Sequence, residues 1–95
     1  MELAIGIILG CCALGAGICM GIGAVGPGIG EGNAVSSACE AIGRQPEAKS
    51  DVTSTMIMGC AIAETTGIYS LVIAIMLIFV APGIMINLLK TTLGL

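Results

Sequence analysis

Two carboxylates lie far from every other charge, inside segments that are otherwise apolar. Glu31 is the only charged residue between positions 3 and 39, and Glu64 is the only one between positions 52 and 89. An ionised carboxylate in hydrocarbon costs several kcal/mol or more, so it persists only if it is protonated, paired or bound to a cation. Because neither segment contains Lys or Arg, we expect the two carboxylates to hold a proton or a metal ion, or to meet a cation from another protein.

Hydroxyl groups follow the second carboxylate closely. Thr65, Thr66 and Tyr69, together with both carboxylates and a backbone carbonyl, make an all-oxygen set, and hard cations such as Na⁺ prefer oxygen ligands. Two close carboxylates do not both stay ionised easily, so one of them is expected to hold a proton. Structural alternatives remain open. Each Thr hydroxyl could instead bond the carbonyl four residues earlier, and Tyr69 could be an interfacial aromatic anchor.

The elements that must position these residues are two long helices. A helix needs about 20 apolar residues to span a bilayer, and both apolar segments exceed that length. The polar residues between them include Gly43 and Pro46, which are typical of a helix end and a helix start. The pattern predicts an all-α membrane protein with one hairpin domain, 1–95. Its parts are span one at about 3–42, a polar loop at about 43–48, span two at about 49–81 and a C-terminal tail at 82–95, with a kink expected at Pro82 and Gly83.

In such a hairpin the two carboxylates lie at similar depths. Glu31 comes 13 residues before Arg44, and Glu64 comes 18 residues after Pro46. These depths differ by one or two helical turns, which helix tilt and side-chain reach can close. The loop carries Arg44 and Lys49, whereas the other side carries only Lys90, so the positive-inside tendency favours a cytoplasmic loop.

The composition excludes several other classes of protein. Only 9% of the residues are charged, whereas about a quarter are charged in ordinary globular chains. A soluble monomer, a disordered chain and a large catalytic domain are therefore excluded. No basic run supports nucleic-acid binding, and the five cysteines are interpreted as small packing residues. Residues 21–26 match GxGxxG but lie within a helix without a preceding strand, so no organic cofactor is expected.

Small residues divide into two sets on the first helix. A wheel of 100° per residue places them on roughly opposite flanks: Ala13, Gly17, Gly21, Gly28 and Gly32 on one, and Gly15, Cys19, Gly23, Gly26 and Gly30 on the other. An aliphatic face lies between the flanks, and the face with Met20, Pro27 and Glu31 is expected to point toward the second helix. Close neighbours on both sides predict identical copies in a closed homo-oligomeric ring. A generic Gly-rich membrane helix is the alternative.

The chain resembles the c subunit of F-type ATP synthases, the proteolipid of the membrane rotor ring. The resemblance covers nearly the whole chain and rests on the Gly-rich first helix, the Arg44–Gln45–Pro46 turn and the single acid of the second helix. It is greatest to the sodium-translocating branch. Pro27–Gly–Ile–Gly–Glu31–Gly32 is similar to that branch's first-helix motif, and Ala63–Glu64–Thr65–Thr66–Gly67–Ile68–Tyr69 to its second-helix motif.

The resemblance implies a role for each residue of the ion site. Glu64 is the ion-carrying carboxylate and Glu31 a second ligand, while Thr65 binds Na⁺ through its hydroxyl and Ile62 through its carbonyl, both from the adjacent subunit. Glu31 replaces the Gln of many sodium rings, so the charge balance requires an extra proton on the carboxyl pair. H⁺ in place of Na⁺ remains the alternative cargo.

Two further residues complete the implied site. Tyr69 is expected to hydrogen-bond Glu64 and lock the closed site, and Thr66 to hold a bound water. Thr65 often appears as Ser in this branch, and here it keeps the oxygen but adds a methyl group.

The resemblance also implies partners and a location. Arg44, Gln45 and Pro46 are expected to contact the central-stalk subunits, and a stator a subunit is expected to supply an arginine opposite Glu64. Identical subunits and membrane lipid are the other expected partners. The expected location is a bacterial inner membrane. The chain is then no enzyme by itself. A self-assembling membrane pore is the alternative from another class, and a small drug/proton antiporter is a third; the pore does not need two acids framed by Thr and Tyr.

Overall fold

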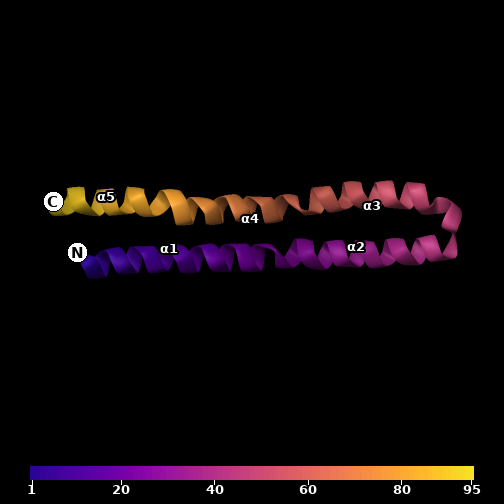
Figure 1. Cartoon of the computed structure of the whole chain (residues 1–95), viewed down its shortest axis with the longest axis horizontal. Coiled ribbons are helices and arrows are strands. Elements are labelled where there is room, and N and C mark those ends of the chain that lie inside the picture. Colours follow the sequence, from indigo (N-terminus) through magenta and orange to yellow (C-terminus); the bar gives the residue numbers. More distant parts are fainter.

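Two helical arms run antiparallel and are joined by one tight turn (Figure 1). The computed structural model describes residues 1–95. The first arm contains α1 (Glu2–Gly23) and α2 (Val25–Arg44), and the second contains α3 (Lys49–Ala63), α4 (Thr65–Ile75), η2 (Met76–Val80) and α5 (Ala81–Leu93). The molecule measures 71 × 16 × 11 Å, and both termini lie at the end opposite the turn. The predicted all-α hairpin is confirmed.

The turn forms where a proline follows a helix end. A residue before proline is disfavoured in the α region, and Gln45 accordingly has φ −135° and ψ 82°, which ends α2. Pro46 then begins the short 3₁₀ helix η1 (Pro46–Ala48), because its missing N–H costs nothing in a first helical turn. The Gln45 N–H still bonds the Ala41 carbonyl at 2.9 Å, and α3 starts directly after η1.

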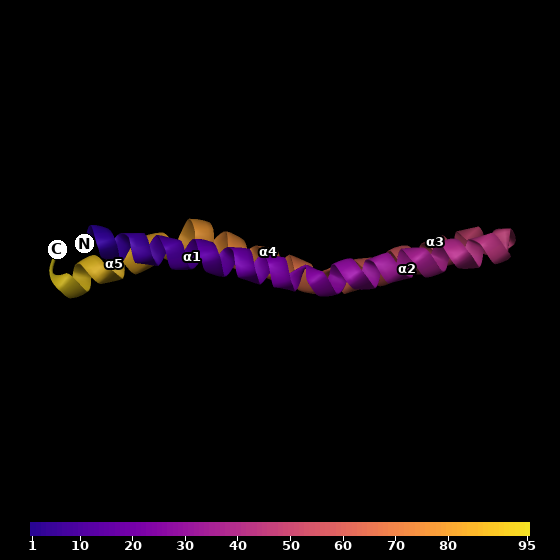
Figure 2. The ribbon, with the colours of Figure 1, turned by 90° about the horizontal axis from the view of Figure 1, so that it is seen from below.

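The first arm bends between α1 and α2 because of Pro27. Proline has no N–H, so the Gly23 carbonyl lacks its usual partner four residues on. Ala24, the next residue, departs from regular helix with φ −86° and ψ −14°. Backbone hydrogen bonds of 3.0 Å from Ala24 to Met20 and from Gly28 to Ala24 keep the arm continuous. Figure 2 shows the change of direction at this junction.

The second arm departs from regular helix at Glu64 itself. This residue separates α3 from α4 and has φ −72° and ψ −12°. Its N–H bonds the Cys60 carbonyl at 2.9 Å, and its own carbonyl accepts from the Ile68 N–H at 3.0 Å. Glu64 is therefore held within a continuous arm, at a place where the helix changes geometry. Figure 2 shows the two arms following the same bend.

Beyond α4 the helix widens into a π-helical turn shortly before Pro82. η2 (Met76–Val80) ends two residues before Pro82, whose ring would otherwise crowd the carbonyl four residues earlier. The helix then continues as α5, so most of the segment expected as a tail from residue 82 onward is helical. Gly94, with φ 73°, ends α5 with two bonds, from its own N–H to Thr91 and from the Leu95 N–H to Lys90.

The interface between the arms is narrow and built from small side chains. The buried apolar residues are Cys12, Ala16, Ala38 and Ala74. The Cys12 thiol contacts the Met85 sulfur at 3.9 Å, which connects α1 to α5. Many large aliphatic residues point away from this interface, and those of the predicted aliphatic face are all more than half exposed: Ile18, Ile22, Val25 and Ile29.

Both arms are long and apolar enough to span a membrane. The continuous helical stretches are Glu2–Arg44 and Pro46–Leu93, of 43 and 48 residues. At about 1.5 Å per residue each is roughly twice the ~30 Å of the hydrocarbon core. So many exposed aliphatic side chains would aggregate in water, and they suit a chain surrounded by lipid and by other helices.

Candidate ion-binding site

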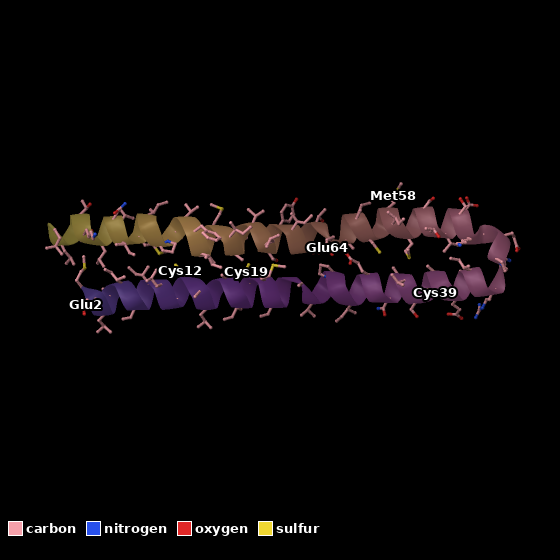
Figure 3. The ribbon with its side chains drawn as sticks, in the orientation of Figure 1. Glu2, Cys12, Cys19, Cys39, Met58 and Glu64 are labelled. Atoms are coloured by element: carbon pink, nitrogen blue, oxygen red, sulfur yellow. The ribbon has the colours of Figure 1, made fainter.

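The carboxyl groups of Glu31 and Glu64 lie close to each other between the two arms. Glu31 projects from α2, and Glu64 lies at the junction of α3 and α4; both are partly exposed. Figure 3 shows Glu64 near the middle of the hairpin, well away from the turn. Two carboxylates this close do not both stay ionised easily, so one of them is expected to hold a proton. Such a pair leaves acceptor oxygens for a further ligand.

No basic side chain neutralises this pair. The one salt bridge of the hairpin joins Arg44 to Glu40 near the turn, where both side chains are exposed. The acid pair also lies outside any group of three His, Cys, Asp or Glu residues that could hold a metal ion. A transition-metal site is not formed here, whereas a proton or a monovalent cation needs fewer acidic ligands.

The register of the arms brings the two carboxylates to one level. Gly67 of α4 faces Pro27 of the first arm, and a Cβ atom built on Gly67 would lie 3.8 Å from the proline Cγ. One turn further, Gly23 faces Ser70, and the Cys19 thiol donates to the Ser70 carbonyl at 3.6 Å. The distances of Glu31 and Glu64 from the turn differ in the sequence by one or two helical turns. The register set by these contacts brings the two residues to the same level.

Ile62 and Thr65 present their oxygens on the outside of the hairpin. The Thr65 hydroxyl donates to the Ile62 carbonyl at 2.8 Å, and Ile62 is 67% exposed. Neither residue hydrogen-bonds the carboxyl pair of its own chain. Within one chain the four residues expected to bind Na⁺ thus form two separate pairs, one between the arms and one on the surface.

Thr66 and Tyr69 also lie outside the carboxyl pair. The Thr66 hydroxyl donates to the Ala63 carbonyl at 3.4 Å, and the Thr66 carbonyl accepts from the Ser70 hydroxyl at 3.1 Å. Both threonines therefore bond carbonyls three residues earlier, not four. Tyr69 is 66% exposed and makes no hydrogen bond within the chain, so its hydroxyl is available to lipid, solvent or another subunit.

The glycines expected to pack the ring differ in their surroundings. Gly15 and Gly23 face the second arm, since a Cβ atom would meet Leu77 at 3.6 Å from the first and Ser70 from the second. The other six have open space within the hairpin: Gly17, Gly21, Gly26, Gly28, Gly30 and Gly32. Space on the outside of the first arm is what close approach by another helix requires.

Two residues of the site were not predicted from the sequence. Gly67 lies against the Glu64 carboxylate, and Ser70 lies against Gly23. The available signal was the position of Gly67 three residues after Glu64, which puts both residues on one face of a helix. Which atoms meet there depends on the side-chain conformation of Glu64, and a helix spacing does not define it.

The fold and the carboxyl pair define the class of protein: an antiparallel membrane hairpin with one carboxylate deep in each apolar arm. The family model for the C subunit of ATP synthase matches residues 14–77. The chain is 57% identical over 76 residues to the ATP synthase c subunit of Alkaliphilus oremlandii, which covers 80% of this chain and 85% of that protein. It is 56% identical over 79 residues to the ATP synthase c subunit of Thermotoga maritima, covering 83% and 93%. The ATP synthase c subunit of Natranaerobius thermophilus is 50% identical over 76 residues, covering 80% and 87%.

The chain belongs to the ATP synthase c-subunit family. The resemblance to this family is therefore confirmed, and the chain is a rotor-ring component and an integral membrane protein. It is a non-catalytic subunit of a larger complex. Family membership favours this function over the self-assembling pore and the drug antiporter.

Proposed function

We propose that this protein carries Na⁺ on its Glu31–Glu64 pair and passes it through the membrane as its ring rotates. The observation that carries the proposal is that the two carboxyl groups lie close together between the arms, with no basic side chain paired to them. Two carboxylates with one proton and one Na⁺ have no net charge. A neutral site can face lipid at tolerable cost, whereas an ionised one cannot.

The remaining ligands come from the neighbouring copy. Thr65 and Ile62 present a hydroxyl and a carbonyl oxygen on the exposed side of one hairpin. An adjacent hairpin that approaches across the open glycine flank brings its own carboxyl pair toward these oxygens. Each site then lies between two subunits and has the all-oxygen ligand set that Na⁺ prefers. Thr66 holds a water there, and Tyr69 donates a hydrogen bond to Glu64.

Rotation follows from the exchange of the ion at the stator. An arginine of the stator a subunit displaces Na⁺ from Glu64 and prevents the empty site from returning. The membrane potential supplies about 2.3 kcal/mol per charge per 100 mV for each step. Arg44, Gln45 and Pro46, all exposed at the turn, contact the central stalk and transmit the torque to a soluble catalytic head. In a bacterial inner membrane, the positive-inside tendency places this turn on the cytoplasmic side.

Carbodiimide labelling of the assembled ring tests the choice of ion. Organic carbodiimides react with a protonated carboxyl group in an apolar site, so they report whether Glu64 holds H⁺ or a metal ion. Rings in mild detergent are labelled across a range of pH, with and without Na⁺, and K⁺ at equal ionic strength is the control. We expect Na⁺ to slow labelling of Glu64 and K⁺ to leave it unchanged.

The opposite result is equally clear. Labelling that Na⁺ fails to slow at any pH excludes the sodium site and leaves H⁺ as the cargo of the same carboxyl pair. The Glu64→Gln variant identifies the reacting residue, because it must abolish the Na⁺-sensitive labelling.

A further inference from the structure

Of all the glycines, two come closest to the side chains of other residues. A Cβ atom would lie closer than 3.0 Å to another side chain only at Gly23 and Gly67. Gly23 lies on the first arm beside the bend at Ala24, and Gly67 lies one turn beyond the irregularity at Glu64. At Gly67 the atom in the way is the carboxylate oxygen of Glu64 itself, 2.7 Å from the built Cβ.

We propose that Gly67 is the positioning residue that allows the Glu64 carboxylate to lie inward, against Glu31. The Glu64 side chain occupies the volume that any side chain at residue 67 would take, with its Oε1 at 2.7 Å and its Cδ at 3.5 Å from the built Cβ. Gly67 is buried. This inference rests on the proposed function, since it concerns the same carboxyl pair.

The surroundings determine how a methyl group at this position would act. On the side of the first arm the built Cβ meets Pro27 Cγ at 3.8 Å, an ordinary van der Waals distance, so the methyl group would fit against a rigid ring. The conflicting atom is the end of a flexible side chain, which can rotate away. The helix therefore tolerates Gly67→Ala, and Ala is the better helix former. What moves is the carboxylate, away from Glu31 and toward the exposed side of the hairpin.

This displacement has two measurable consequences in the assembled ring. Glu64 becomes more accessible to a hydrophobic carbodiimide, so labelling without Na⁺ is expected to be several-fold faster than in the unmodified ring. Because the carboxylate no longer shares a site with Glu31, the Na⁺ concentration that halves labelling is expected to rise at least tenfold. Gly59→Ala is the matched control, because it adds the same methyl group on the same arm where nothing lies within 4 Å.

A double-mutant cycle separates positioning from general damage to the helix. Glu64→Asp shortens the acid by one methylene group and withdraws it from residue 67. Adding Gly67→Ala to Glu64→Asp is therefore expected to change neither the labelling rate nor the half-protecting Na⁺ concentration. A methyl group that merely distorted the helix would affect both backgrounds equally, and that result would overturn the inference.

The outcomes also distinguish this inference from the proposed function. If Na⁺ protects the unmodified ring and Gly67→Ala matches it in both measurements, the positioning role is wrong and the sodium site stands. If Na⁺ protects neither ring, the sodium site is wrong. The labelling rate without Na⁺ then still decides the role of Gly67, since a rate equal to that of Gly59→Ala rejects it.

Discussion

The carboxyl groups of Glu31 and Glu64 lie close together across the two arms of the hairpin, at a depth where no basic side chain reaches them. Because two carboxylates this close do not both stay ionised easily, the proposed site holds one proton and one negative charge. One further monovalent cation makes the site neutral, and this charge balance connects the structure to the family's function in the membrane.

Removal of the oxygen atoms of Glu31 is predicted to weaken Na⁺ binding. Glu31→Leu deletes a contact to a charged group worth about 1.5–3 kcal/mol, so the Na⁺ concentration that halves carbodiimide labelling is expected to rise roughly ten- to hundredfold. Glu31→Gln keeps a side-chain oxygen and an N–H donor toward Glu64, and its half-protecting concentration should stay close to that of the unmodified ring. Equal effects of Leu and Gln would mean that Glu31 is not a ligand.

The hydroxyl of residue 65 is predicted to matter more than its methyl group. Thr65→Val removes the donor to the Ile62 carbonyl and a proposed Na⁺ ligand. The loss should weaken Na⁺ binding by about 1 kcal/mol, so the protection of Glu64 by Na⁺ should be several-fold weaker. Thr65→Ser retains the oxygen, so Na⁺ should protect Glu64 from labelling as well as it does in the unmodified ring. Thermal dissociation of the purified ring, followed by gel electrophoresis, checks that neither variant fails to assemble.

A methyl group at Gly23 is predicted to destabilise the hairpin. Gly23→Ala collides with the side chain of Ser70, including its Cβ atom, which cannot rotate away. Overpacking of this kind typically costs about 1–3 kcal/mol, and the ring should dissociate at a lower temperature. Transfer of the glycine to the opposite arm, in Gly23→Ala with Ser70→Gly, should restore part of the loss. No recovery in the double variant would show that the two residues do not meet.

Loss of Arg44 is predicted to uncouple the ring from the soluble head without changing ring stability. Its ion pair with Glu40 is exposed at both ends, and exposed pairs contribute little to stability. Arg44→Ala should therefore leave thermal dissociation unchanged but reduce ATP-driven Na⁺ transport in membrane vesicles. Glu40→Ala breaks the same ion pair and keeps the arginine, so it should transport normally. Equal loss of transport in both variants would assign the effect to the ion pair.

The hairpin, its turn and its two intramembrane acids could be predicted from the sequence. Each depends on a local property of the chain: the length of the apolar segments, the effect of Pro46 on the residue before it, and the isolation of Glu31 and Glu64 from other charges. The family resemblance came from local motifs as well. Such local properties do not depend on which residues of the other arm face them.

The contacts between the arms were decided by the tertiary structure alone. Gly67 faces Pro27 and Gly23 lies against Ser70 because the arms pack in one register. A helical wheel assigns a residue to a face, but it carries no information about the level at which the facing helix meets it. The π-helical turn of η2 shifts the face of every residue beyond it, and the kink expected at Pro82 does not by itself specify that shift. Contacts that depend on register between distant segments are therefore specified only when both arms are in place.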